Sequence, residues 1–206
     1  MSAERFPQDV IELQAWLSNQ SPIEGVTAVP GFGTDVPLYI LGSSMFGASL
    51  AAKLGLPYSF ASHFAPQHLE QACAYYRANY EPSERYPEPY LIAAVNVTAA
   101  DTAEDADRQE EIVHRNRVRS LIGRRGQLLS DDQLDAVVQS YQGKQIIDML
   151  RYTAKGTGED VKGYLEWFRD HVQADELMIS LQAASHAEAL RSMEITAEAW
   201  GNQQGA

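Results

Sequence analysis

The chain has 206 residues and a formal net charge of −12, from 28 acidic against 16 basic residues, and 45% of its residues are hydrophobic. This composition is enough for one substantial buried core and excludes a disordered polypeptide. A generally acidic surface argues against nucleic acid or an anionic membrane as the main partner. We therefore expect neither kind of partner.

The chain contains one cysteine, Cys73, so it has no internal disulfide, and a cysteine-based metal site is not expected. Cys73 lies within an amphipathic helical pattern over residues 69–77, which predicts a buried structural thiol. No apolar run approaches the roughly 20 residues that a membrane helix needs, and the N-terminus lacks the apolar segment of a signal peptide. These patterns predict a soluble, cytoplasmic protein.

The first half of the chain carries the signals of a helix followed by a βαβ unit. Proline near the start and apolar spacing predict a helix over residues 6–17. An apolar run over 36–41 predicts a strand that stops at Gly42. A helix with small and apolar positions follows and ends at Gly55, and residues 58–60 form the next strand.

The rest of the chain also alternates between helices and strands. We expect a helix over about 66–80, an irregular segment at 81–89 and a strand over 90–100. Two helices follow, capped at 101–102 and at Ser130, and a third begins at about 156. The chain then continues with a strand over 175–180, a helix over 187–199 and a frayed tail at 201–206. About four strands, each followed by helix, predict a parallel sheet. The element lengths suit either a barrel-type or an open, doubly wound sheet. A closed eight-stranded barrel needs about twice the number of strands that this chain offers.

The turn after residues 36–41 carries the most informative chemistry of the chain. It contains Gly42, Ser43 and Ser44 directly before a predicted helix. Backbone N–H groups at a helix N-terminus, together with two hydroxyls, are suited to hold a phosphate. The alternative is that Ser43 and Ser44 only cap the helix. The residues alone do not separate the two interpretations.

Several of these pieces together resemble the C-terminal portion of the bacterial-luciferase-like family of flavin-dependent monooxygenases, over nearly the whole chain. The pieces are residues 6–10, 36–44, 50–66, 76–77, 89–90, 100–102, 156–161, 174–178, His186 and 190–192. The resemblance implies an α/β fold that is the C-terminal half of a (β/α)8 TIM-type barrel. It implies one luciferase-like domain over residues 1–206 that lacks the N-terminal half of the barrel.

The resemblance also assigns roles to residues. It places the FMN phosphate at Gly42, Ser43, Ser44 and Gly47, the glycine allowing close backbone approach. Ser62 and His63 end the next strand, where a barrel places its active site, so Ser62 is expected to contact the cofactor. His63 is a candidate proton donor or acceptor near pH 7, and the alternative is a histidine that is hydrogen-bonded within the core or rim.

Other side chains receive plainer interpretations. His68, His114 and His171 lie on predicted helices and are expected at the surface, whereas His186 follows the last strand and has a possible role at the barrel top. The histidines and carboxylates show no metal-ligand spacing, so no metal site is expected. An aromatic group is expected in the core: Tyr152, Tyr164, Trp167 and Phe168. A basic group is expected on a solvated helix face or loop, with an anion contact as the alternative: Arg115, Arg117, Arg119, Arg124 and Arg125.

The leading hypothesis is an FMN-dependent monooxygenase that uses reduced flavin, supplied by a separate reductase, and O2 on a small organic substrate. Because half of the pocket is absent, the isolated chain is expected to be weak or inactive, and to form a homodimer or depend on a separate N-terminal half. One alternative is a non-catalytic flavin- or phosphate-binding homologue that acts through dimerisation. Another is a phosphate-binding α/β domain unrelated to flavin. The sequence leaves the substrate and the choice between FMN and a deazaflavin open.

Overall fold

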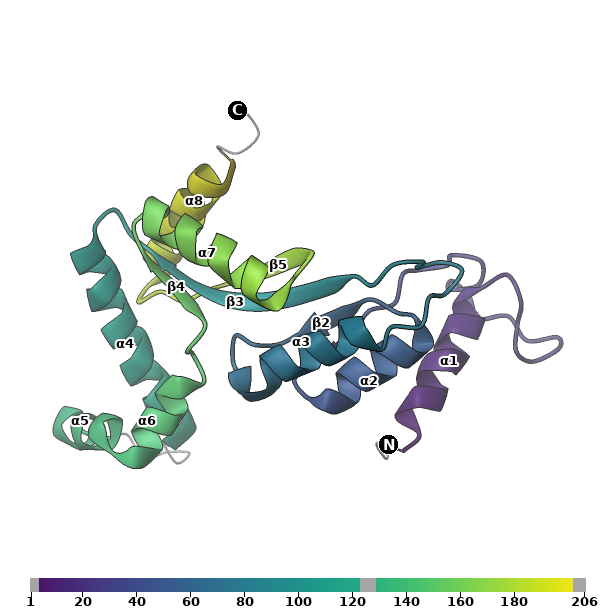
Figure 1. Cartoon of the computed structure of the whole chain (residues 1–206). Coiled ribbons are helices and arrows are strands. Elements are labelled where there is room, and N and C mark those ends of the chain that lie inside the picture. The colour runs from purple at the N-terminus through teal and green to yellow at the C-terminus, as the bar shows by residue number, and fades with distance from the viewer. Residues whose placement is uncertain (1–3, 123–128, 202–206) are drawn as a thin grey trace.

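The computed structural model describes residues 4–122 and 129–201, so residues 202–206 of the predicted tail lie outside the described residues. Helices and strands alternate along the chain (Figure 1). The elements are α1 Phe6–Leu17, β1 Ile40–Gly42, α2 Met45–Leu54, β2 Tyr58–Phe60, a short 3₁₀-helix Pro66–His68, α3 Leu69–Ala78, β3 Leu91–Ala99, α4 Ala103–Ile122, α5 Asp131–Gln139, α6 Tyr141–Asp148, β4 Thr153–Gly156, α7 Gly158–Val172, β5 Glu176–Leu181 and α8 His186–Gly201.

All the described strand pairs are parallel, and β3 is the centre of the sheet. β2 pairs with residues 91–93 of β3, and β4 pairs with residues 96–99. β5 pairs with residues 92–97, so it overlaps both and lies on the opposite side of β3. β1 pairs with β2. The four strands expected from the sequence, β1, β2, β3 and β5, are therefore neighbours in chain order, as consecutive strands of a barrel are.

The two faces of the sheet differ. Alternate residues of β3, starting at Leu91, belong to the main core, which also contains Ile40, Tyr58 and Phe60. Helices cover this face, and their contacts run from α2 to α3, from α3 to α7 and from α7 to α8. The other face of the sheet includes Leu41, which is 69% exposed. This arrangement is that of a barrel segment with its helices on the outside.

Local sequence signals explain most helix boundaries. Gly55 ends α2 in the left-handed conformation, with φ at 59°, as a residue without a Cβ does most easily. Ser130 starts α5 with a capping box to Gln133, and Thr157 starts α7 with one to Asp160. These boundaries confirm the start and stop signals expected from the sequence.

Three features differ from the sequence-based expectations. The first strand begins at Ile40 and not at Val36, because β2 offers only three pairing residues and Pro37 has no N–H to donate. α6 and β4 were not expected. β4 is four residues long and pairs only with the end of β3, so its sequence carries little periodic signal.

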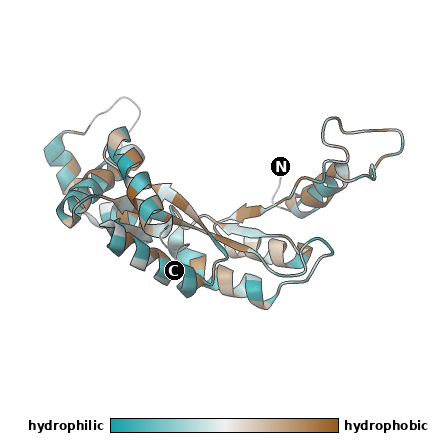
Figure 2. Cartoon of the chain, turned by 90° about the horizontal axis from the view of Figure 1, so that it is seen from above, coloured by the Kyte–Doolittle hydropathy of each residue, from teal (hydrophilic) through white to brown (hydrophobic). Residues whose placement is uncertain are grey.

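The ends of the molecule lie apart, and the sheet is open in the described residues (Figures 1 and 2). α1 and the loop after it are at one end, where Phe6 contacts Phe46 of α2 with ring centroids 6.4 Å apart. α4, α5 and α6 are at the other end, around a small separate core of Val118, Leu134 and Ile146. Among the described residues, none of the helices combines the length and the apolar character needed to cross a membrane.

Two predictions about buried side chains are tested directly. Cys73 is buried, and burial raises its pKa to about 12, which confirms a structural thiol. Tyr152 and Phe168 are buried and their ring centroids are 5.2 Å apart, as expected for core packing. Trp167 is different, because it is exposed and stacks on His171 at 4.9 Å.

Candidate functional site

The Ser43–Ser44 turn lies between the end of β1 and the start of α2. Ser44 is the N-cap residue of α2 and has an extended backbone, but its side chain makes no capping hydrogen bond. Within the described residues, no hydrogen bond engages either serine hydroxyl. The first N–H groups of a helix have no acceptor within it. The turn therefore presents unused donors next to two free hydroxyls, and the capping alternative receives no support.

Gly42 and Gly47 hold this turn in place through close packing. A Cβ on Gly47 would lie 3.2 Å from the Tyr58 ring and 3.4 Å from the Gly42 Cα. The Tyr58 hydroxyl donates to the Ser44 carbonyl at 3.2 Å, and burial raises the pKa of Tyr58. The ring of Tyr58 thus occupies the space that the missing side chains leave. Gly47 has no side chain, so its backbone N–H is the one donor that it could offer to a ligand.

Ser62 and His63 follow β2, as expected. Ser62 is fully buried and its hydroxyl donates to the Ala94 carbonyl, which ties the end of β2 to β3. That Ser62 also contacts a cofactor stays a prediction. His63 is half-buried, and its Nδ1 is buried without a hydrogen-bond partner in the described part of the chain. Burial and the positive charge of Arg117 lower the pKa of His63. The imidazole is therefore neutral at pH 7.

A buried polar network connects the ends of the central strands, and sequence analysis missed it. Asn96 of β3 is fully buried and donates to the His63 carbonyl at 2.9 Å. Gln182, which directly follows β5, donates to the Asn96 side-chain oxygen at 3.0 Å and to the Ser180 hydroxyl at 3.1 Å. Thr98 donates to the Gln182 carbonyl at 3.0 Å. The sequence signal that could have revealed this network is the presence of two polar residues, Asn96 and Thr98, in the otherwise apolar strand β3.

The other histidines do not join this site. His68, His171 and His186 are exposed, and His171 contacts Glu70 at 3.1 Å. His114 is half-buried and lines a pocket where α4 meets α5 and α6, and burial lowers its pKa. No group of three or more metal-ligating side chains is present within residues 4–122 and 129–201.

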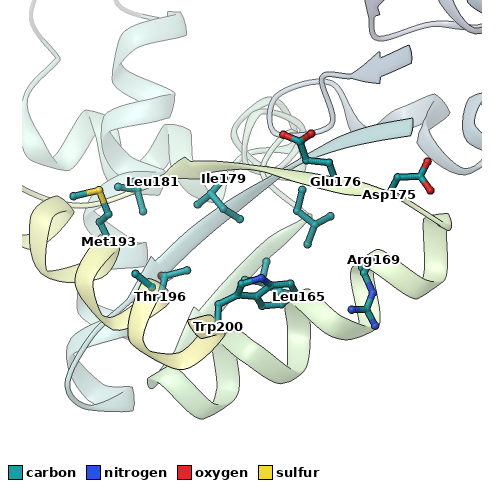
Figure 3. A pocket seen from close by; sticks show the side chains of 11 residues that line it. Leu165, Arg169, Asp175, Glu176, Ile179, Leu181, Met193, Thr196 and Trp200 are labelled. Carbon is teal, nitrogen blue, oxygen red and sulfur yellow. The ribbon is translucent and has the colours of Figure 1, made fainter. Parts of the chain in front are cut away.

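An apolar groove of about 520 Å³ lies at the opposite edge of the sheet from the Ser43–Ser44 turn. Figure 3 shows its walls, which come from β5, α7 and α8. Its apolar side chains include Leu165, Ile179, Leu181, Met193 and Trp200, and charged side chains such as Arg169 lie at one end. The groove follows the edge of β5 that pairs with no other strand in the described residues.

The sequence profile of luciferase-like monooxygenases matches residues 8–196. The chain belongs to the luciferase-like monooxygenase family. A family relative from Escherichia coli (strain K12), named luciferase-like monooxygenase, is 37% identical over 196 residues. That match covers 93% of this chain and 58% of the relative, so the chain spans well under two thirds of its length.

Solved structures agree with this family assignment. The crystal structure of apo-MsnO8 has a TM-score of 0.80 and 28% identity, and the match covers 97% of this chain and 61% of that one. The coenzyme F420 dependent tetrahydromethanopterin reductase from Methanopyrus kandleri shares the fold, with a TM-score of 0.55 and 15% identity over 95% of this chain and 62% of that chain. The α/β fold of TIM-barrel luciferase-like enzymes is thereby confirmed.

Proposed function

We propose that this chain carries the cofactor-phosphate site of an FMN-dependent monooxygenase, at the Ser43–Ser44 turn. The observation that carries the proposal is the pair of unengaged hydroxyls beside a free helix N-terminus, in a chain of the luciferase-like monooxygenase family. The FMN phosphate bears about two negative charges near neutral pH, which a helix N-terminus favours. The phosphate would accept hydrogen bonds from Ser43, Ser44 and the first N–H groups of α2.

The other residues of the site have supporting roles in this proposal. Gly42 and Gly47 keep strand and helix close enough to aim the N–H groups at one point. Ser62 and His63 lie at the end of the neighbouring strand, where His63 would hold or accept a proton on the substrate side. Reduced FMN, when bound, supplies the chemistry with O2. FMN is proposed in preference to F420, the cofactor of the Methanopyrus protein, because the luciferase-like family match and the monooxygenase name of the Escherichia coli relative point to flavin.

The partners are part of the same proposal. A separate reductase would supply reduced FMN, and the substrate would be a small organic molecule. The unpaired edges of β1 and β5 support pairing with a second chain, either another copy or the remaining half of a barrel. We place the protein in the cytoplasm and expect little activity from these 206 residues alone.

A complementation assay distinguishes the hypothesis of an enzyme from that of a non-catalytic binding protein. The part of the Escherichia coli relative that this chain does not match is co-expressed with it, and oxygen consumption is measured with NADH, FMN and a flavin reductase. We expect consumption above the background of reductase and FMN, and loss of the gain in a Ser43→Ala/Ser44→Ala variant. FMN binding without any gain in oxygen consumption would instead favour a non-catalytic homologue that acts through dimerisation.

A further inference from the structure

The basic group on α4 divides into paired and unpaired arginines. Arg115 forms ion pairs with Asp135 and, at 3.5 Å, with Asp131. Arg119 pairs with Asp131 at 3.4 Å. These two arginines therefore attach α4 to α5, which agrees with the interpretation of a helix face. Arg124 and Arg125 lie outside the described residues.

Arg117 is different, because no ion pair joins it to a carboxylate in the described residues. Each of the other nine described arginines has at least one carboxylate partner. The segments outside the described ranges contain no Asp or Glu that would pair with Arg117. Its Nε atom is buried and has no hydrogen-bond partner among the residues that the structure describes. A cation without a counter-ion is unexpected in a chain with 28 acidic residues, and burying its Nε unpaired is costly.

The position of Arg117 connects it to the candidate site. It lines a pocket of about 240 Å³ with Asn116 and Ser120 of α4 and with Gln182, the residue after β5. Gln182 bonds Asn96, which in turn bonds the His63 carbonyl. The Arg117 charge is felt at His63, whose Nδ1 is also unpartnered. Ligands of parallel α/β sheets bind at this carboxyl edge of the strands.

We propose that Arg117 binds an anionic group of the substrate, a carboxylate or similar oxyanion, in the pocket that it lines with Gln182. The guanidinium fork matches two carboxylate oxygens, and a bound anion would offset the positive charge of Arg117 that lowers the pKa of His63. Calling this anion the substrate's rests on the proposed function. The pocket therefore selects organic acids over neutral molecules.

Anion binding is tested on the full chain by titrating sodium benzoate and sodium sulfate at constant ionic strength. The readout is the Hε1 NMR resonance of His63, assigned from its absence in His63→Gln. We expect a saturable shift with at least one anion, weakened at least about tenfold in Arg117→Gln and less in Arg117→Lys. The matched control is Arg119→Gln, two residues further along α4 and not among the residues that line the pocket, which should leave the affinity unchanged.

Several outcomes overturn this proposal. The first is that the folded protein shows no saturable shift with either anion. The second is that the affinity is unchanged in both Arg117→Gln and Arg117→Lys. The third is that sodium chloride shifts the His63 resonance as much as benzoate or sulfate does. FMN and riboflavin distinguish the source of the anion: if Arg117→Gln weakens FMN and spares riboflavin, the anion is the cofactor phosphate and the substrate assignment is wrong. If the FMN affinity is the same in the wild type and in Ser43→Ala/Ser44→Ala, the proposed phosphate site is wrong. The anion titration can still be interpreted in that case.

Discussion

Replacing Asn96 with leucine is expected to lower the free energy of unfolding by about 3 kcal/mol, because it removes two hydrogen bonds of a fully buried side chain and takes the side-chain donor away from the His63 carbonyl. The lost bonds are the one from Asn96 to the His63 carbonyl and the one from Gln182 to Asn96. Asn96 is fully buried, so water cannot replace them without rearrangement. The same change should disturb His63 and the pocket beside Arg117. Urea unfolding of the two proteins measures the difference.

The matched control is Asn79→Ala, which removes an exposed asparagine that donates to the Tyr75 carbonyl at 2.9 Å. Because solvent can take over this bond, the change should cost at most about 1 kcal/mol. If Asn96→Leu unfolds at the same urea concentration as the wild type, the buried network does not hold the strand ends together.

The chain is expected to self-associate at concentrations of about 100 µM, because the described sheet leaves the edges of β1 and β5 unpaired. The groove along β5 adds apolar surface to one of these edges (Figure 3). Met193 lines this groove and is 50% exposed, so a charge there should weaken association without disrupting the core. Sedimentation velocity of Met193→Glu should show at least about tenfold weaker association.

The control for this prediction is Tyr141→Glu on α6, a residue that is 79% exposed and lies outside the groove. It adds the same charge to an exposed apolar residue and should leave association as it is. A wild-type chain that remains monomeric and melts in one cooperative transition would contradict the expected role of the free edges.

The sequence predicts the fold well where elements are long or carry their own boundary signals. β3 is apolar at almost every position, and the structure buries all nine of its residues. The helix capped at Ser130 and the end of α2 at Gly55 follow from local chemistry. β4 was missed because it has only four residues, paired at one end of β3, which is too few to show the alternation of apolar and polar residues typical of a strand. α6 was missed because Gly143 and few apolar residues weaken its helical pattern.

The candidate site is predictable only in part. The Ser43–Ser44 turn is local in sequence, so its place before α2 was foreseen. The effect of the Arg117 charge on the pKa of His63, and the bond between Asn96 and Gln182, join residues far apart in the chain. Such contacts depend on how the strands and α4 are arranged in space. The sequence shows only that a polar residue stands within a buried strand and that arginines recur along a helix.

The central claim is that the Ser43–Ser44 turn binds the FMN phosphate, and comparing FMN with riboflavin tests it most directly. Both flavins are titrated with the purified chain and followed by flavin fluorescence. We expect saturable FMN binding that is at least about tenfold tighter than riboflavin binding, since only FMN carries the phosphate. In Ser43→Ala/Ser44→Ala this preference should shrink toward equality. Equal affinities for the two flavins in the wild type, or a preference unchanged in the double variant, would contradict the phosphate site.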